Sequence, residues 1–178
     1  MSSHAVFNAL TYVQHQIVSN ENRASLKALS TFAGFIRNSS NDIELEERLI
    51  TKESAMLESY CVLEQWRFAD RVSITTNIKV KEGSMAPGFL FTPFIEQVLL
   101  SVLKLESKEI KIEIDIISDQ LTATINQNID LLPIESLSEE QKRRRILFEE
   151  RVQFLKDQWI LQVKTSGNQW QLNFKPNK

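Results

Sequence analysis

The chain has few of the residues that usually interrupt helices and strands, with only four glycines and four prolines among 178 residues. Its single cysteine, Cys61, cannot close an intrachain disulfide, which fits a reducing compartment. No apolar run approaches the ~18 residues of a membrane-spanning helix, and the N-terminus lacks the charged-then-apolar pattern of a secretion signal. We therefore expect a cytoplasmic protein without a membrane span, in which Cys61 is a small core residue rather than a reactive thiol.

An excess of charge of either sign is also absent. Lysine and arginine number 21 against 23 aspartates and glutamates, giving a net charge of −2 and a pI of about 5.8. Because no global positive field attracts nucleic acid, we expect no nucleic-acid partner. With 178 residues, of which 42% are hydrophobic, the chain can bury a sizeable core in one ordinary domain or in two small ones.

Helical periodicity dominates the first part of the chain. A first helix is expected from about residue 4 to Val18, followed in NENRASLKALSTFAGFIR by a second helix or the continuation of one kinked helix. IELEERLITKESAMLESYCVLEQWRF resumes the pattern and completes a helical hairpin. Its apolar stripes need partners, so we expect a homodimer in which two hairpins form a four-helix bundle. The apolar positions of the three segments are Val6, Leu10, Val13 and Ile17, then Leu26, Leu29, Phe32, Ala33 and Ile36, and finally Leu49, Met56, Leu57, Tyr60 and Leu63.

The rest of the chain has the pattern of an α/β sandwich. Alternation predicts strands in DRVSITTNIKV, KEIKIEIDII and LTATIN, the last two joined by the turn SD, and two more strands around SGN near the C-terminus. EGSMAPG is expected as a turn, FLFTPFIEQVLLSVLKL as a buried helix, and SLSEEQKRRRILFEERVQFLKDQW as a long helix capped at Ser136 or Ser138. The expected fold is therefore α+β, with a helical hairpin over residues 1–70 and a sandwich with a mostly antiparallel sheet over residues 71–178.

The only two histidines, His4 and His15, lie on one polar stripe of the first helix. At about 100° per residue, Asn8 falls on the same stripe, one turn after His4. A neutral imidazole is nucleophilic near neutral pH, and the Asn8 amide could orient it or an incoming phosphoryl group. His15 is about 16 Å further along the helix, too far to share a metal with His4, so we expect no metal site. Two solvated histidines without a function fit the same spacing.

Several motifs, in this order, resemble the cytoplasmic portion of LytS-type sensor histidine kinases. HAVFNAL is similar to the phosphoacceptor segment of that family, LITKESAMLESYCVLEQWRFADRV to the second hairpin helix, APGFLFTPFIEQVLLSVLK to the start of the nucleotide-binding region, and SGNQWQLNFKP to the closing strand. The likeness covers nearly the whole chain and implies that His4 is the phosphoacceptor in bacterial two-component signalling. The matching positions after the first motif are Glu53, Tyr60, Glu64, Arg67, Phe68, Pro87, Leu90, Pro93 and Glu96.

The chain departs from this family at the positions that hold ATP. Gln97 stands where the family has a magnesium-binding asparagine, and Ile129 stands where the Asp-Asn-Gly adenine motif has glycine. No glycine occurs between Gly88 and Gly167 to form the phosphate-binding lid. We therefore expect a sandwich that has the family's shape but binds no ATP and no other cofactor. The other departures are Leu100, Ser101, Val102, Gln127 and Asn128.

The resemblance leads to two main hypotheses. In the first, the chain is a histidine phosphotransfer protein in which His4 accepts and donates phosphate, Asn8 orients it, and a response-regulator receiver domain is the partner. This resembles alphaproteobacterial phosphotransferases that descend from histidine kinases. In the second, it is a pseudokinase adaptor that binds signalling partners without phosphotransfer. A third hypothesis, an active kinase with unusual ATP contacts, conflicts with the missing glycines.

Two groups of charged residues are more simply interpreted as ion pairs than as binding or catalytic residues. The run from Arg143 to Arg145 is expected on a solvated helix face, paired with nearby Glu139 and Glu140. The second group consists of Glu64, Arg67 and Asp70, and its spacing fits ion pairs within one helix.

Overall fold

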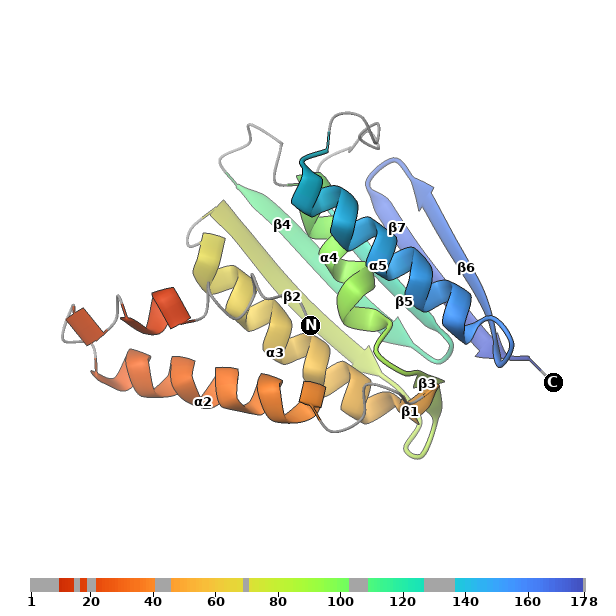
Figure 1. The fold of residues 1–178 in the computed structure, drawn as a ribbon, viewed down its shortest axis with the longest axis horizontal. Helices are drawn as coiled ribbons and strands as arrows, with labels where there is room; N and C mark the ends of the chain where they lie inside the picture. Colours follow the sequence, from red (N-terminus) through yellow and green to blue (C-terminus); the bar gives the residue numbers. More distant parts are fainter. Residues whose placement is uncertain are drawn as a thin grey trace.

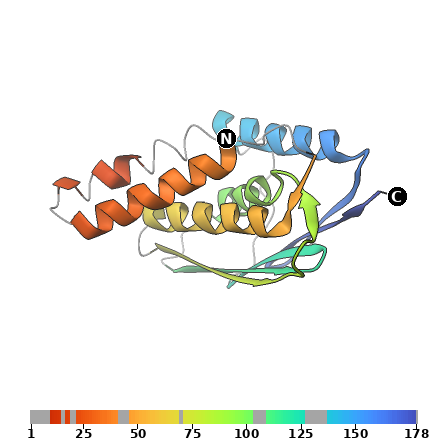
Figure 2. The same ribbon diagram turned by 90° about the horizontal axis from the view of Figure 1, so that it is seen from below.

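A computed structural model shows an α+β protein, as predicted, in which helices cover one face of a mostly antiparallel sheet (Figures 1 and 2). The described residues are 10–14, 17–18, 22–40, 46–68, 71–102, 109–126 and 137–177. The helices are α2 (Asn22–Ser40), α3 (Ile50–Phe68), α4 (Phe91–Val102) and α5 (Glu139–Leu155). The strands are β1 (Glu47–Leu49), β2 (Val72–Lys79), β3 (Met85–Pro87), β4 (Ile110–Ile117), β5 (Gln120–Ile125), β6 (Trp159–Ser166) and β7 (Gln169–Pro176).

The main sheet has the strand order β2-β4-β5-β7-β6. Strands β2 and β4 are parallel, and the other neighbours are antiparallel. The predicted turn between β4 and β5 is confirmed, with Ser118 in the left-handed region at φ 53°, and Gly167 turns the chain between β6 and β7 at φ 57°. Every second residue of β4 is a buried isoleucine, so the alternation that predicts this strand also places its apolar side in the core.

A second, two-stranded sheet was not predicted. Residues 43–49 were expected to be helical and EGSMAPG to be a turn, but β1 pairs antiparallel with β3. The pairing joins segments almost 40 residues apart, from Glu47 opposite Pro87 to Leu49 opposite Met85. Local periodicity carries no information about such a partner, and the tertiary contact overrides the helical pattern.

Helix α2 lies beside α3 (Figure 1) and packs only partly through the expected stripe, of which Phe32 and Ile36 are half-buried against the core. Ser25, Ala28 and Phe35 are buried, whereas Leu26 and Leu29 of the expected stripe are exposed. The small side chains of Ser25 and Ala28 fit a closely packed pair of helices, so α2 uses them and leaves its leucines outside. The described parts of the first helix, residues 10–14 and 17–18, are helical as predicted.

One continuous core joins α3 and α4 to the sheet. Leu57 of α3, Phe94 of α4 and Ile114 of β4 are fully buried members of it, and Cys61 is buried in it too, as expected for a core residue. Helix α5 begins with a capping box, in which Ser138 is the N-cap and exchanges hydrogen bonds with Gln141. The division of the chain at residue 70 stays a prediction.

Candidate functional site

The candidate phosphoacceptor His4, its neighbour Asn8 and His15 lie outside the described residues. The structure does describe residues 10–14, which follow in the sequence and are helical. The Tyr12 ring stacks on Trp66, near the C-terminal end of α3, with 5.0 Å between ring centroids and an interplanar angle of 4°. Val13 is buried beside it. Aromatic stacking and apolar burial therefore fix residues 10–14 against α3, the helix with which the hairpin is completed.

Among the described residues of the first two helices, five large apolar side chains are exposed in the single chain. Such a concentration on neighbouring helices is unusual for a surface that stays in water. These exposed side chains form a set on segments for which the sequence predicts a dimeric bundle. Its members are Leu10, Ile17, Val18, Leu26 and Leu29, and we call it the hairpin face.

Glu96 of α4 forms an ion pair with α5. In the histidine-kinase resemblance, Glu96 directly precedes the magnesium-binding position. Arg144 Nη1 of α5 donates to Glu96 Oε1 at 2.9 Å, and the two side chains are 8% and 13% exposed. Burial raises the pKa of nearby Tyr60 well above its ordinary value, and the negative charges of Glu64 and Glu96 act in the same direction. The ion pair between Glu96 and Arg144 therefore connects α4 to α5.

A cavity of about 230 Å³ lies between α4, α5 and strands β6 and β7, and neither Glu96 nor Arg144 is among its lining residues. Its walls include Gln97 and Ser101 of α4, Phe148 and Arg145 of α5, and Trp170 of β7. Gln97 Nε2 is buried and has no hydrogen-bond partner among the described residues. Pockets for drug-sized ligands are commonly about 300–1,000 Å³, so this cavity is small, and its walls combine aromatic and aliphatic side chains with polar and charged ones. Gln127, Asn128 and Ile129 lie outside the described residues.

The three consecutive arginines of α5 have separate environments, which corrects the expectation of one solvated face. Arg144 is buried against Glu96, Arg145 pairs with Glu149 one turn later at 3.1 Å, and Arg143 is exposed. Glu139, expected as their partner, pairs instead with Lys142 at 2.7 Å.

The other predicted charge group is only partly described. Glu64 is buried, whereas Asp70 and the side chain of Arg67 lie outside the described residues. The expected ion pairs within this helix therefore stay a prediction.

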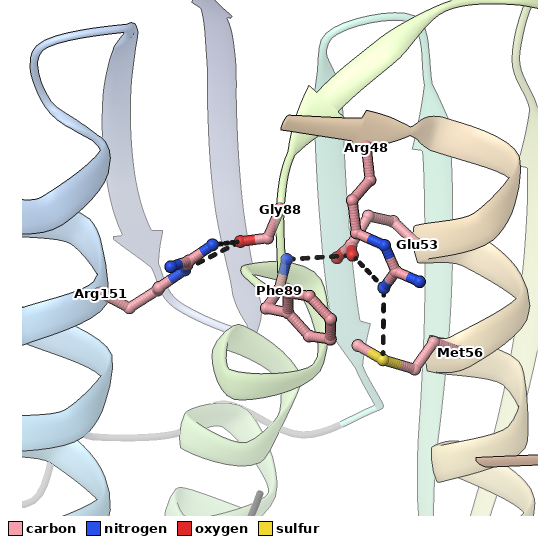
Figure 3. A network of polar contacts seen from close by, with 6 residues as sticks. All are labelled: Arg48, Glu53, Met56, Gly88, Phe89 and Arg151. Carbon is pink, nitrogen blue, oxygen red and sulfur yellow. Dashed lines mark hydrogen bonds and ion pairs between the residues drawn. The ribbon is translucent and has the colours of Figure 1, made fainter. Parts of the chain in front are cut away.

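A buried polar network at the opposite end of α3 was not identified from the sequence (Figure 3). Arg48 Nη1 of β1 donates to Glu53 Oε1 of α3 at 2.9 Å, and their side chains are 3% and 0% exposed. The Phe89 N–H donates to the same carboxylate oxygen at 3.0 Å, and Arg48 also contacts Met56 Sδ at 3.7 Å. Burial raises the pKa of the Glu53 carboxyl, whereas the Phe89 amide and the Arg48 guanidinium act to lower it.

The network continues through Phe89 to α5 (Figure 3). Phe89 has a φ of 54°, in the left-handed region that a bulky side chain rarely adopts. The Arg48 guanidinium lies 4.4 Å from the centre of its ring, and Arg151 Nε of α5 donates to the Gly88 carbonyl at 2.9 Å. Desolvation lowers the pKa of Arg151, with Glu53 acting in the opposite direction. The network thereby connects β1, α3, the start of α4 and α5.

Two further searches gave negative results for the part of the chain that is described. No three His, Cys, Asp or Glu side chains there are grouped so that they could hold a metal ion. Among the same residues, no helix combines the length and the apolar character that crossing a membrane requires.

Comparison with known proteins relates the N-terminal part to one family. Residues 1–72 match the family model described as histidine kinase. Two solved structures align along almost the full chain. A bacterial phosphotransferase covers 98% of this chain and 97% of its own at 8% identity and a TM-score of 0.46, and the Acinetobacter baumannii histidine kinase AdeS covers 97% and 96% at 8% identity and a TM-score of 0.41. No curated protein matches the sequence.

Proposed function

We propose that the chain is a histidine-kinase-derived protein of two-component signalling and that it transfers phosphate between His4 and receiver aspartates. The observation that carries the proposal is the family match over residues 1–72, because HAVFN lies within this range and resembles the family's phosphoacceptor segment. The LytS-type assignment of this resemblance is part of the proposal.

The transfer itself needs only one imidazole and the partner's own active site. The unprotonated ring nitrogen of His4 attacks the phosphorus of a receiver phospho-aspartate, forming an N–P bond. The aspartyl O–P bond breaks, and its electron pair leaves on the receiver carboxylate. Asn8, one helical turn after His4, hydrogen-bonds the ring or the phosphoryl oxygens, and the receiver supplies magnesium. The reverse reaction passes the phosphate to a second receiver.

The surroundings of Glu96 support a transfer protein over an ATP-dependent kinase. Its carboxylate is paired with Arg144 at 2.9 Å, and the nearby cavity between α4, α5 and the sheet has a volume of only about 230 Å³. Magnesium is coordinated by oxygen ligands, whereas here the acidic oxygen is held by a guanidinium and Gln97 replaces the asparagine. We propose that the sandwich binds no ATP and serves as a docking surface for the receiver.

The exposed hairpin face supports dimerisation. Tyr12 and Val13 fix the first helix on α3 while Leu26 and Leu29 remain outside, so a second hairpin can cover them. Burying such side chains stabilises an interface by about 25 cal/mol for each Å² of apolar surface removed from water. The proposed dimer is a four-helix bundle made by two hairpins.

The proposal is tested by chemical phosphorylation with a phosphoramidate donor, followed by intact-mass measurement under conditions that preserve phosphohistidine. The chain has only two histidines, so His15→Gln is a matched control for His4→Gln. We expect one added phosphate in the wild type and in His15→Gln, and none in His4→Gln. Equal labelling of all three proteins, or no labelling of the folded wild type, would contradict the proposal and favour the adaptor without phosphotransfer.

A further inference from the structure

Helix α5 has an apolar outer face that its packing in the fold does not explain. Leu155 and Arg144 are buried on its inner side, against α4 and the sheet. On the opposite side Ile146, Leu147 and Phe154 are 53%, 54% and 49% exposed. Three large apolar side chains on one solvent-facing stripe of a single helix indicate a contact surface.

The charges on this face are available for a partner. Lys142 and Arg145 are engaged within α5, through Glu139 and Glu149. Arg143 and Glu150, in contrast, are exposed and form no ion pair with other described residues. They lie one on each side of the Ile146–Leu147 pair.

The spacing of these residues is symmetric about the middle of the pair. Arg143 is three residues before Ile146, and Glu150 is three residues after Leu147. When a second α5 packs antiparallel across a two-fold axis at this point, each Arg143 lies opposite Glu150 of the partner subunit. Each Ile146 then meets Leu147 of the partner subunit. The segment from Arg143 to Glu150 is thereby its own complement in both charge and apolarity.

We propose that the outer face of α5 is a self-association surface that packs against a second copy of this chain. Its location separates it from the hairpin face: α5 lies along α4 on the outside of the helical layer, whereas α2 flanks α3 (Figure 2). A chain with two isologous contacts assembles beyond the dimer. The surface therefore joins hairpin dimers into a larger assembly, and it does not depend on phosphotransfer.

The experiment first disrupts association through the hairpin face, so that association through α5 can be measured by itself. Leu26→Glu with Leu29→Glu places charges on the exposed hairpin face, and sedimentation equilibrium then measures the remaining association. We expect this background to form dimers. Added Arg143→Glu should weaken them about tenfold, because two attractive pairs become repulsive. Adding Glu150→Arg as well should restore the original dissociation constant by exchanging the charges. Lys79→Glu, an exposed charge on β2 at the other edge of the sheet, should change nothing.

Each alternative result overturns the proposal. A strictly monomeric background means that the α5 face takes a different kind of partner or none. Unchanged association in Arg143→Glu, or no recovery in the exchanged variant, means that association occurs through another surface. Because these residues are exposed, their substitution leaves the fold intact, and the far-ultraviolet circular dichroism of all variants should coincide with that of the wild type.

Discussion

Two buried ion pairs at different places in the helical layer have the same chemistry and different surroundings. Arg48 and Glu53 are enclosed, and a backbone amide, a thioether and an aromatic ring make further contacts with them. Arg144 and Glu96 are less enclosed, with side chains that are 8% and 13% exposed. The first pair fixes the junction between the small sheet, α3 and α4. The second lies where the family resemblance places nucleotide chemistry, and there it joins two helices.

The difference predicts that breaking the enclosed pair has the larger effect. Arg48→Met keeps much of the side-chain volume but leaves Glu53, which is 0% exposed, without its guanidinium. Removing one partner of a buried pair typically lowers the free energy of unfolding by about 3–5 kcal/mol. We expect a loss in this range at pH 7 in urea unfolding.

The matched control adds Glu53→Gln to Arg48→Met. The double variant should recover part of the loss, because no buried carboxylate then lacks a cation. If Arg48→Met costs less than about 1 kcal/mol, the network does not hold this junction.

The pH dependence sharpens the same comparison. Burial raises the pKa of Glu53 above its ordinary value of 4.5, and Arg48 opposes this rise. The contribution of this group to stability is therefore fully present below pH 4.5 and is lost as the pH rises through the raised pKa. Without Arg48 the pKa is higher still, so the loss in Arg48→Met should be largest near neutral pH and shrink towards pH 4.5. A loss that grows on acidification would contradict the assigned cause.

Breaking the second pair should have a smaller effect. Glu96→Gln leaves Arg144 with a neutral acceptor in a site that water reaches more easily, and loss of a charged hydrogen bond costs about 1.5–3 kcal/mol. The control is Glu149→Gln, which removes the exposed pair with Arg145 and should cost about 0.5 kcal/mol. Equal losses in the two variants would show that burial of the Arg144 pair has no energetic consequence.

The smallest expected effect concerns nucleotide. Gln97→Asn introduces the residue that the family has at this position, yet Glu96 stays paired with Arg144. Isothermal titration with magnesium-ATP should give no saturable heat with the wild type or with this variant. Saturable binding to the wild type would overturn the proposal that the sandwich binds no ATP.

Most of the fold was predictable because its signals are local. Alternating isoleucines predict β4, helical periodicity and an N-cap at Ser138 predict α5, and short polar turns predict the hairpins. The pairing of β1 with β3 was not predictable, since it depends on a partner far along the chain. The ion pair of Arg48 and Glu53 was not predictable either. The sequence shows two opposite charges five residues apart, but it does not show that the Phe89 N–H also donates to Glu53.

One missed contact had a usable signal. Arg144, Phe148 and Leu155 share a helical face at intervals of four and seven, so the middle arginine of the run lies on the side that packs inward. Its partner Glu96 is 48 residues away and required the structure. For the phosphoacceptor, the sequence motif and the family match remain the basis of the assignment, because His4 and Asn8 lie outside the described residues.

The central claim, transfer between receiver aspartates and His4, is tested most directly with phosphorylated receivers. Receiver domains from response regulators of the same organism are labelled with acetyl phosphate, mixed with the chain and magnesium, and followed by intact mass. We predict that at least one receiver loses its phosphate while the wild type and His15→Gln each gain one, and that His4→Gln gains none. Transfer to His4→Gln as efficient as to the wild type, or no transfer from any receiver to the folded wild type, would contradict the account.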